Sequence, residues 1–262
     1  DHSTDGSMEV IQEYMAKYPG WIRGVFKKQN VGIPKNRNFG LGQVTGNYVA
    51  ILGGDDLFLP YKVEKELDAL SKHPDARCIY SNINIIDAQG QQMGVRDQEI
   101  QPSGDIFFHV VRSKFGLLRS MLINFSALQD VGLLDERFPK YDGYDLTVRL
   151  AKRYQFVYIS DPLVAYREYP NSDSRSLKAK DHLKDLQGIY KKMLPLLADL
   201  SVEDRKEVST IWTRILFKLR VRDALEFGGK TKALFVAFLA MVKGRAKRRD
   251  LRWAIRLIWL RK

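Results

Sequence analysis

The chain has 262 residues, of which 45% are hydrophobic and 28% are charged, and its formal net charge is +12. This composition indicates a globular chain with a sizeable core and excludes disorder, collagen and a disulfide scaffold. The single cysteine, Cys78, cannot form an internal disulfide, which favours a reducing compartment. The longest apolar run, residues 233–242, is about half as long as a membrane-spanning helix requires. The first residues, Asp1 to Asp5, lack the basic start and apolar segment of a signal peptide.

The positive charge is confined to the C-terminal third of the chain. Residues 175–262 carry 23 basic and 9 acidic side chains, a net of +14, which leaves a net of −2 for residues 1–174. We expect the nearly neutral body to carry the chemistry and the basic part to be drawn to an anionic surface. No nucleic-acid-binding motif accompanies the charge, so no nucleic-acid partner is expected.

Short β-rich runs alternate with helical stretches over the first two thirds, which is typical of an α/β layer fold. The spacing of apolar residues predicts helices over residues 8–18 and 61–73, and a loop that runs into a helix over residues 30–46. Strands are predicted, in chain order, at residues 22–27, 48–52, 78–84, 156–159 and 163–166. Residues 141–145 open a helix at Leu146, and the pattern is helical from about Lys180 onward.

Asp55 and Asp56 follow the apolar strand predicted at residues 48–52. In open α/β sheets, ligands bind at the carboxyl ends of strands, where loops converge. Two adjacent acids there repel each other unless a cation or a sugar hydroxyl lies between them, and carboxylate oxygens suit Mg²⁺ or Mn²⁺. The alternative role of such an aspartate is to cap a turn or helix.

Several ordered segments accompany this acid pair. Up to residue 60 they are Asn30-x-Gly32, Asn36-Arg37-Asn38, Gly40-Leu41, Gly46-x-Tyr48, Leu52-Gly53-Gly54-Asp55-Asp56 and Pro60; the later ones lie between Ser120 and Arg167. Together they closely resemble the signature of family 2 glycosyltransferases with the GT-A fold, and residues 1–7 resemble the end of that family's first acidic motif.

The resemblance covers residues 1–176. It implies an α/β fold of the GT-A type, a Rossmann-like mixed sheet flanked by helices, that lacks its first strand and helix. Residues 177–262 would then form a basic helical C-terminal region.

The resemblance implies sugar transfer, with inversion, from a nucleotide-diphospho-sugar to a saccharide or lipid-linked acceptor. The implied nucleotide is UDP, and the implied setting is the synthesis of a cell-surface polysaccharide or glycolipid. Asp55 would lie near the donor ribose or sugar, and Asp56 would hold the Mg²⁺ or Mn²⁺ that bridges the diphosphate. Asp1 would border the site of the base. Arg37 would lie near the phosphates, and a structural role in a loop-to-helix turn is its alternative.

The general base is where the sequence departs from the family's pattern. The family places it second in an acidic pair ahead of a Tyr-Asp-Leu segment, and the aligned pair here is Asp142-Gly143. We expect Asp142 to be the base, with the flexible Gly143 allowing a one-residue shift. Asp145 is the fallback, although an aspartate that opens a helix is more often a cap. The alternative is a homologue that binds nucleotide sugars and is catalytically impaired.

Residues 244–262 predict a helix with basic and apolar stripes. The basic stripe is Arg245, Arg249, Arg252 and Arg256, and the apolar face holds Leu251, Ala254, Ile255 and Ile258. With Trp253 and Trp259, this is the composition of an interfacial membrane helix, which predicts contact with an anionic membrane surface. The alternative is a helix packed on the body with a solvated basic face. The expected location is cytoplasmic and peripheral, at the inner face of the cell membrane.

Overall fold

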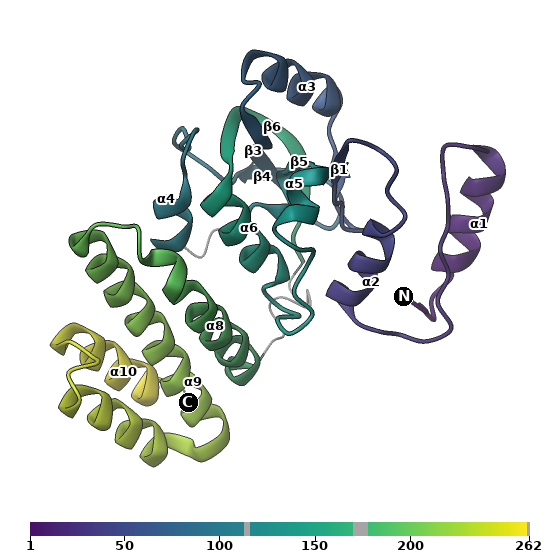
Figure 1. Ribbon diagram of the computed structural model, residues 1–262. Coiled ribbons are helices and arrows are strands. Elements are labelled where there is room, and N and C mark those ends of the chain that lie inside the picture. Colours follow the sequence, from purple (N-terminus) through teal and green to yellow (C-terminus); the bar gives the residue numbers. More distant parts are fainter. Residues whose placement is uncertain (113–115, 170–177, 261–262) are drawn as a thin grey trace.

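A computed structural model describes residues 1–112, 116–169 and 178–260 (Figure 1). Within these residues the centre is a mixed six-stranded sheet in the order β1-β5-β3-β6-β2, with β4 paired to β3. The strands are β1 (Tyr48–Ala50), β2 (Leu57–Phe58), β3 (Ala76–Ile86), β4 (Gln92–Val95), β5 (Leu122–Asn124) and β6 (Gln155–Arg167). β3 and β6 run parallel, whereas the other pairs are antiparallel.

Helices surround the sheet and extend from one side of it. They are α1 (Ser7–Lys17), α2 (Ile33–Leu41), α3 (Lys62–Lys72), α4 (Phe107–Arg112), α5 (Phe125–Asp130), α6 (Asp142–Arg153), α8 (Ala179–Met193), α9 (Val202–Val242) and α10 (Arg248–Leu260), with short 3₁₀ turns η1 (Leu118–Ser120) and η2 (Leu194–Leu197). Figure 1 shows α1 at the opposite end of the molecule from α8, α9 and α10. No residue of α1 is buried.

Successive side chains of β3 point to opposite faces of the sheet, so they lie in two different apolar clusters. Ile79 lies in the smaller cluster, against which α3 packs, whereas Cys78 and Tyr80 lie in the main core. The main core continues into the C-terminal helices, where Trp212 of α9 is fully buried and donates from Nε1 to the carbonyl of Val111, 2.7 Å away. One core therefore joins residues on both sides of the boundary predicted at residue 176.

The C-terminal end of the chain forms a helical hairpin. α9 is interrupted at Gly229, whose φ of 70° and ψ of −173° are accessible mainly to glycine. Beyond this break, Ala233 and Ala237 pack against Ala254 and Ile258 of α10, and all four are fully buried. Ala254 and Ile258 of the apolar face of α10 thus pack on α9, in line with the alternative interpretation of residues 244–262, whereas Ile255 of the same face is 41% exposed. Every helix in the described part of the chain is too short or too polar to pass through a bilayer.

Most predicted elements are present, with three differences. Residues 22–27 are not a strand: none of the described strands pairs with them, and Ile22, Val25 and Phe26 are exposed. A strand needs a neighbouring backbone to satisfy its hydrogen-bonding groups, and apolar character alone does not supply one. The strands predicted at 156–159 and 163–166 are the single strand β6, which has a register irregularity between them. The strand predicted at 48–52 is shorter and only half buried.

Candidate active site

A cleft of about 460 Å³ opens where the loop after β1, the start of α6 and the end of β6 meet. Four of the six predicted site residues line it: Arg37, Asp55, Asp56 and Asp142. They come from three segments of the chain, and Asp142 lies 105 positions from Arg37 in the sequence. The fold therefore brings Asp55, Asp56 and the predicted base Asp142 to one cavity, at the carboxyl end of a strand where α/β sheets usually bind ligands.

The acid pair consists of one buried and one exposed carboxylate. Asp56 is only 7% exposed, and its Oδ1 accepts a hydrogen bond from the backbone N–H of Arg167 over 3.1 Å. Burial raises the pKa of Asp56, because desolvation disfavours the carboxylate. Asp55 accepts a hydrogen bond from the hydroxyl of Tyr169 over 2.9 Å. A Cβ at Gly53 would lie 2.8 Å from Asp55 Oδ1 and 3.0 Å from Asp56 Oδ2, so glycine leaves both carboxylates the room they occupy.

Cationic side chains face these acids from other elements. Arg119 lies 3.9 Å from Asp56 Oδ2, and its guanidinium stacks over the ring of Tyr166 at 3.8 Å. Arg167 donates from Nε to the backbone carbonyl of Asp55. Sequence reasoning missed Arg119; the only signal was its place beside the segment Ser120-Met121-Leu122. The cleft therefore offers guanidinium groups next to its carboxylates, a combination that suits a phosphate held near a cation.

Asp142 lies at the first turn of α6, where its carboxylate has two partners. Oδ2 accepts from Nη1 of Arg37 over 2.8 Å, and Oδ1 accepts from the backbone N–H of Gly143 over 2.9 Å. A Cβ at Gly143 would lie 2.9 Å from both Cβ and Cδ2 of Leu118. Because Leu118 approaches so closely, the position that aligns with the family's usual base has no room for a side chain, and Asp142 carries the carboxylate at this end of the cleft.

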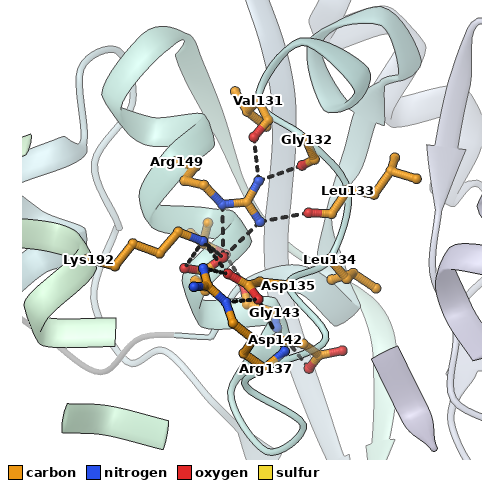
Figure 2. A network of polar contacts seen from close by, with 12 residues as sticks. Val131, Gly132, Leu133, Leu134, Asp135, Arg137, Asp142, Gly143, Arg149 and Lys192 are labelled. Carbon is orange, nitrogen blue, oxygen red and sulfur yellow. Dashed lines mark hydrogen bonds and ion pairs between the residues drawn. The ribbon is translucent and has the colours of Figure 1, made fainter. Parts of the chain in front are cut away.

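Asp145, the fallback, does not line the cleft. Its buried carboxylate accepts from Nε of Arg149 over 2.8 Å and pairs with the ammonium of Lys192, 2.7 Å away. Arg149 also donates to the backbone carbonyls of residues 131–133, and Lys192 reaches Asp135 (Figure 2). The network ties α6 to α8 and to the loop before Asp135. The structure thus gives Asp145 a positioning role for the helix that carries Asp142.

Asp1 also lies outside the residues that line the cleft. Its two carboxylate oxygens accept from the backbone N–H groups of Val31 and Gly32, each over 2.9 Å. Gly32 has a φ of 87°, which a side chain would disfavour, and it immediately precedes α2, the helix of Arg37. In the structure, Asp1 holds the loop that positions this helix.

The described residues contain no group of three or more His, Cys, Asp or Glu side chains that would enclose a metal ion. Asp55 and Asp56 nevertheless fit a divalent cation of the kind that one or two carboxylates share with the phosphates of a substrate. The burial of Asp56 supports this fit, because a bound cation would offset the desolvation of its carboxylate. A metal would therefore need oxygens from the donor or from water to complete its coordination.

Comparison with solved structures shows a shared fold. The fold matches that of S. aureus TarS 1–349 in complex with UDP, with a TM-score of 0.61, 16% identity and coverage of 97% of this chain and 75% of that one. It also matches the mannosyltransferase PcManGT from Pyrobaculum calidifontis in complex with GDP-Man and Mn²⁺, with a TM-score of 0.55, 14% identity and coverage of 100% and 76%. The chain has the mixed α/β architecture of GT-A transferases.

Residues 1–131 match Glycosyl transferase family 2, and the chain belongs to this family. An uncharacterized glycosyltransferase of Methanocaldococcus jannaschii is 28% identical over 167 residues, which span 63% of this chain and 57% of that protein. An uncharacterized protein of Mycobacterium bovis is 31% identical over 103 residues, 39% of this chain and 29% of that protein. The chain thus spans well under two thirds of the length of these relatives.

Proposed function

We propose that the protein transfers a hexosyl group, with inversion, from a nucleotide-diphospho-sugar, with UDP as the nucleotide, to a saccharide or lipid-linked acceptor. The observation that carries this proposal is the convergence of Asp55, Asp56 and Asp142 on one cleft in a chain of glycosyl transferase family 2. Solved structures of similar fold hold UDP in one case and GDP-Man with Mn²⁺ in another. The setting that the resemblance suggests is the synthesis of a cell-surface polysaccharide or glycolipid.

The proposed chemistry assigns one task to each end of the cleft. At one end, Asp56, with Asp55 beside it, would hold Mg²⁺ or Mn²⁺, which when bound neutralises the charge of the departing diphosphate. Arg119 would bind the same diphosphate by charge-assisted hydrogen bonds. At the other end, Asp142 would take the proton of the acceptor hydroxyl as that oxygen attacks the anomeric carbon from the face opposite the leaving group. Attack from the opposite face inverts the configuration.

Arg37 fits the base end of this scheme. Its guanidinium holds the carboxylate of Asp142 in one orientation, with Oδ2 2.8 Å from Nη1. A carboxylate held in this way is oriented but also occupied, so the acceptor hydroxyl must share or displace the arginine's hydrogen bond. Arg37 would thus position the base rather than bind phosphate directly.

The second candidate function is nucleotide-sugar binding without transfer. Gly143 at the position of the family's usual base favours it, because among the described residues only Asp142 then offers a carboxylate at the end of the cleft near α6. The two candidates differ in turnover and agree in donor binding.

We further propose that the C-terminal helices contact an anionic membrane surface, at the inner face of the cell membrane, where a lipid-linked acceptor would lie. The net charge of +14 over residues 175–262 supports this contact.

Calorimetric titration with UDP, with and without Mn²⁺, tests the donor site in the unmodified chain and in Asp56→Asn. We expect binding that requires Mn²⁺ and is lost in the variant. Asp161→Asn is the matched control, since Asp161 is an exposed aspartate paired with Lys65 and does not line the cleft. If UDP, GDP, dTDP and CMP all fail to bind the unmodified chain, the proposed function is wrong.

A further inference from the structure

The second half of α9, residues 230–242, has an outer face made of apolar side chains. Leu234, Phe235, Phe238, Met241 and Val242 are 37–64% exposed, although large apolar side chains are usually buried. At 100° per residue these five positions span an arc of about 120°, and Ala233 and Ala237, which are buried against α10, lie outside that arc. We call these five residues the outer face of α9.

This segment of helix is apolar all round, which is unusual for a helix that faces water. From Ala233 to Val242 the sequence contains no polar residue, so one side is covered by α10 and the other is left uncovered. A helix that is apolar on every side is normally enclosed by protein or by lipid. We therefore expect the outer face of α9 to be covered by a second surface, either protein or lipid.

The charge around this face indicates what that surface is. Residues 227–262 contain eleven basic side chains and a single acid, Asp250, which is paired with Arg214. Lys230 and Lys232 precede the apolar segment, Lys243 and Arg245 follow it, and all four are exposed. Apolar side chains bounded by exposed cations are the composition of a helix that lies in the headgroup region of an anionic bilayer.

The position of the segment suits contact with a flat surface. The break at Gly229 turns the chain, and Figure 1 shows residues 230–242 running along the edge of the molecule farthest from the sheet. A second copy of the chain is a poorer occupant. A symmetric dimer through this face would bring two such cationic regions together, and like charges in contact oppose association.

We propose that the outer face of α9, which contains the aromatic side chains Phe235 and Phe238, inserts into the interface of an anionic lipid bilayer while Lys230, Lys232 and Lys243 contact the lipid phosphates. This deepens the membrane contact named in the proposed function and rests on it. It also moves the point of contact from the arginine stripe of α10 to the second half of α9. On α10, Ala254 and Ile258 are buried against α9, so that among the described side chains Ile255 and Trp259 are its exposed large apolar groups, fewer than the five of the outer face of α9.

Vesicle flotation of the purified chain tests this assignment, with phosphatidylcholine vesicles that contain or lack about one third phosphatidylglycerol. We expect the unmodified chain to float with the anionic vesicles only. Phe235→Ser/Phe238→Ser should weaken this partitioning by about tenfold or more, because two exposed aromatic side chains no longer enter the interface. The matched control is Met93→Ser/Ile100→Ser, which removes two exposed apolar side chains from the β4 region and should float normally.

Three results would overturn the proposal. One is failure of the unmodified chain to float with anionic vesicles. Another is normal flotation of Phe235→Ser/Phe238→Ser together with loss of flotation in Arg252→Gln/Arg256→Gln, which would return the contact to α10. The third is a dimer in sedimentation that the phenylalanine variant converts to a monomer, which would make the face an interface between copies. UDP binding, measured on the same preparations, reports on the donor site separately and should be the same in all variants.

Discussion

The guanidinium of Arg37 lies 2.8 Å from the carboxylate of Asp142, across 105 positions of sequence. α2 supplies the arginine and α6 the aspartate, and both side chains line the same cleft. The pair places a cation beside the carboxylate that we propose as the base, so the base is fixed in direction before an acceptor binds. A catalytic group that is held in the reactive geometry before the substrate binds increases the reaction rate.

Replacing Asp142 by Asn should abolish proton acceptance while keeping the shape of the side chain. We expect turnover to fall by about 10²- to 10⁴-fold, the usual contribution of a general base, with UDP affinity unchanged within about twofold. Release of UDP from UDP-sugars with saccharide acceptors measures the first quantity, and calorimetry measures the second. Unchanged turnover would remove Asp142 as the base. If the unmodified chain binds donor and shows no turnover, the non-catalytic candidate is correct.

Arg119 should contribute to diphosphate binding. We expect Arg119→Gln to lower UDP affinity by about tenfold or more, because a hydrogen bond to a charged group contributes about 1.5–3 kcal/mol. Arg119→Lys should retain part of the affinity, and uridine, which lacks phosphate, should bind both variants as it binds the parent. Arg112→Gln is the control, since Arg112 is similarly exposed but pairs with Glu207 outside the cleft. Equal losses for UDP and uridine would assign Arg119 a structural role instead.

The raised pKa of Asp56 predicts two pH effects with opposite directions. Protons compete with metal for the carboxylate, so Mn²⁺-dependent UDP affinity should fall as pH drops through this pKa, at a higher pH than for an ordinary aspartate. Between the unfolded value of about 3.9 and the raised folded value, the folded state binds more protons. In the absence of metal, the contribution of Asp56 to the free energy of unfolding is therefore greatest at low pH, and it is lost as the pH rises through that window.

Asp56→Asn should remove both effects. Thermal unfolding without metal should show a variant more stable than the parent above this window, with the difference shrinking as the pH is lowered. A difference that does not change with pH would contradict the link to Asp56.

Gly143 should be intolerant of a side chain. Gly143→Ala places a Cβ within 2.9 Å of Leu118, and we expect a loss of about 1–3 kcal/mol in the free energy of unfolding, as for other overpacked sites. Leu118→Ala in the same chain should recover part of that loss, so the double variant should be more stable than the sum of the single effects predicts. Gly40→Ala, where nothing lies within 4 Å, is the control and should be neutral or stabilising. Urea unfolding measures the parent, the two single variants, the double variant and the Gly40→Ala control.

Lys62 and Glu66 form a buried ion pair one turn apart on α3, with side chains 2% and 0% exposed. Glu66 Oε2 has no hydrogen-bond partner among the residues that the structure describes, so the pair is incompletely satisfied there. Lys62→Met alone should destabilise the fold by about 3–5 kcal/mol, because it leaves a buried carboxylate unpaired. Lys62→Met/Glu66→Leu should be near neutral or stabilising by denaturant unfolding. Equal destabilisation of the single and double variants would show that the pair itself contributes the stability.

Local signals in the sequence were sufficient to predict the elements with strong patterns and to place the acid pair after a strand. The helices around residues 8–18 and 61–73, the strand that contains Cys78 and the GT-A fold class follow from periodicity, helix starts and ordered motifs. Asp55 and Asp56 could be predicted as site residues because they lie a few positions beyond the strand predicted at 48–52, and that is a local relationship. The strand predicted at residues 22–27 was wrong because a strand depends on a neighbouring strand that is distant in the sequence.

What the sequence by itself determined is the family, the order of the elements and the residue types available for chemistry. Only the tertiary structure decided which of those residues meet. It brought Arg37 to Asp142 and Arg119 to Asp56, enclosed Asp145 in an ion-pair network, and turned one apolar face of α9 toward solvent. The physical reason is that local patterns reflect backbone preferences and one-sided burial, whereas contacts between distant segments depend on how all the layers pack around one core.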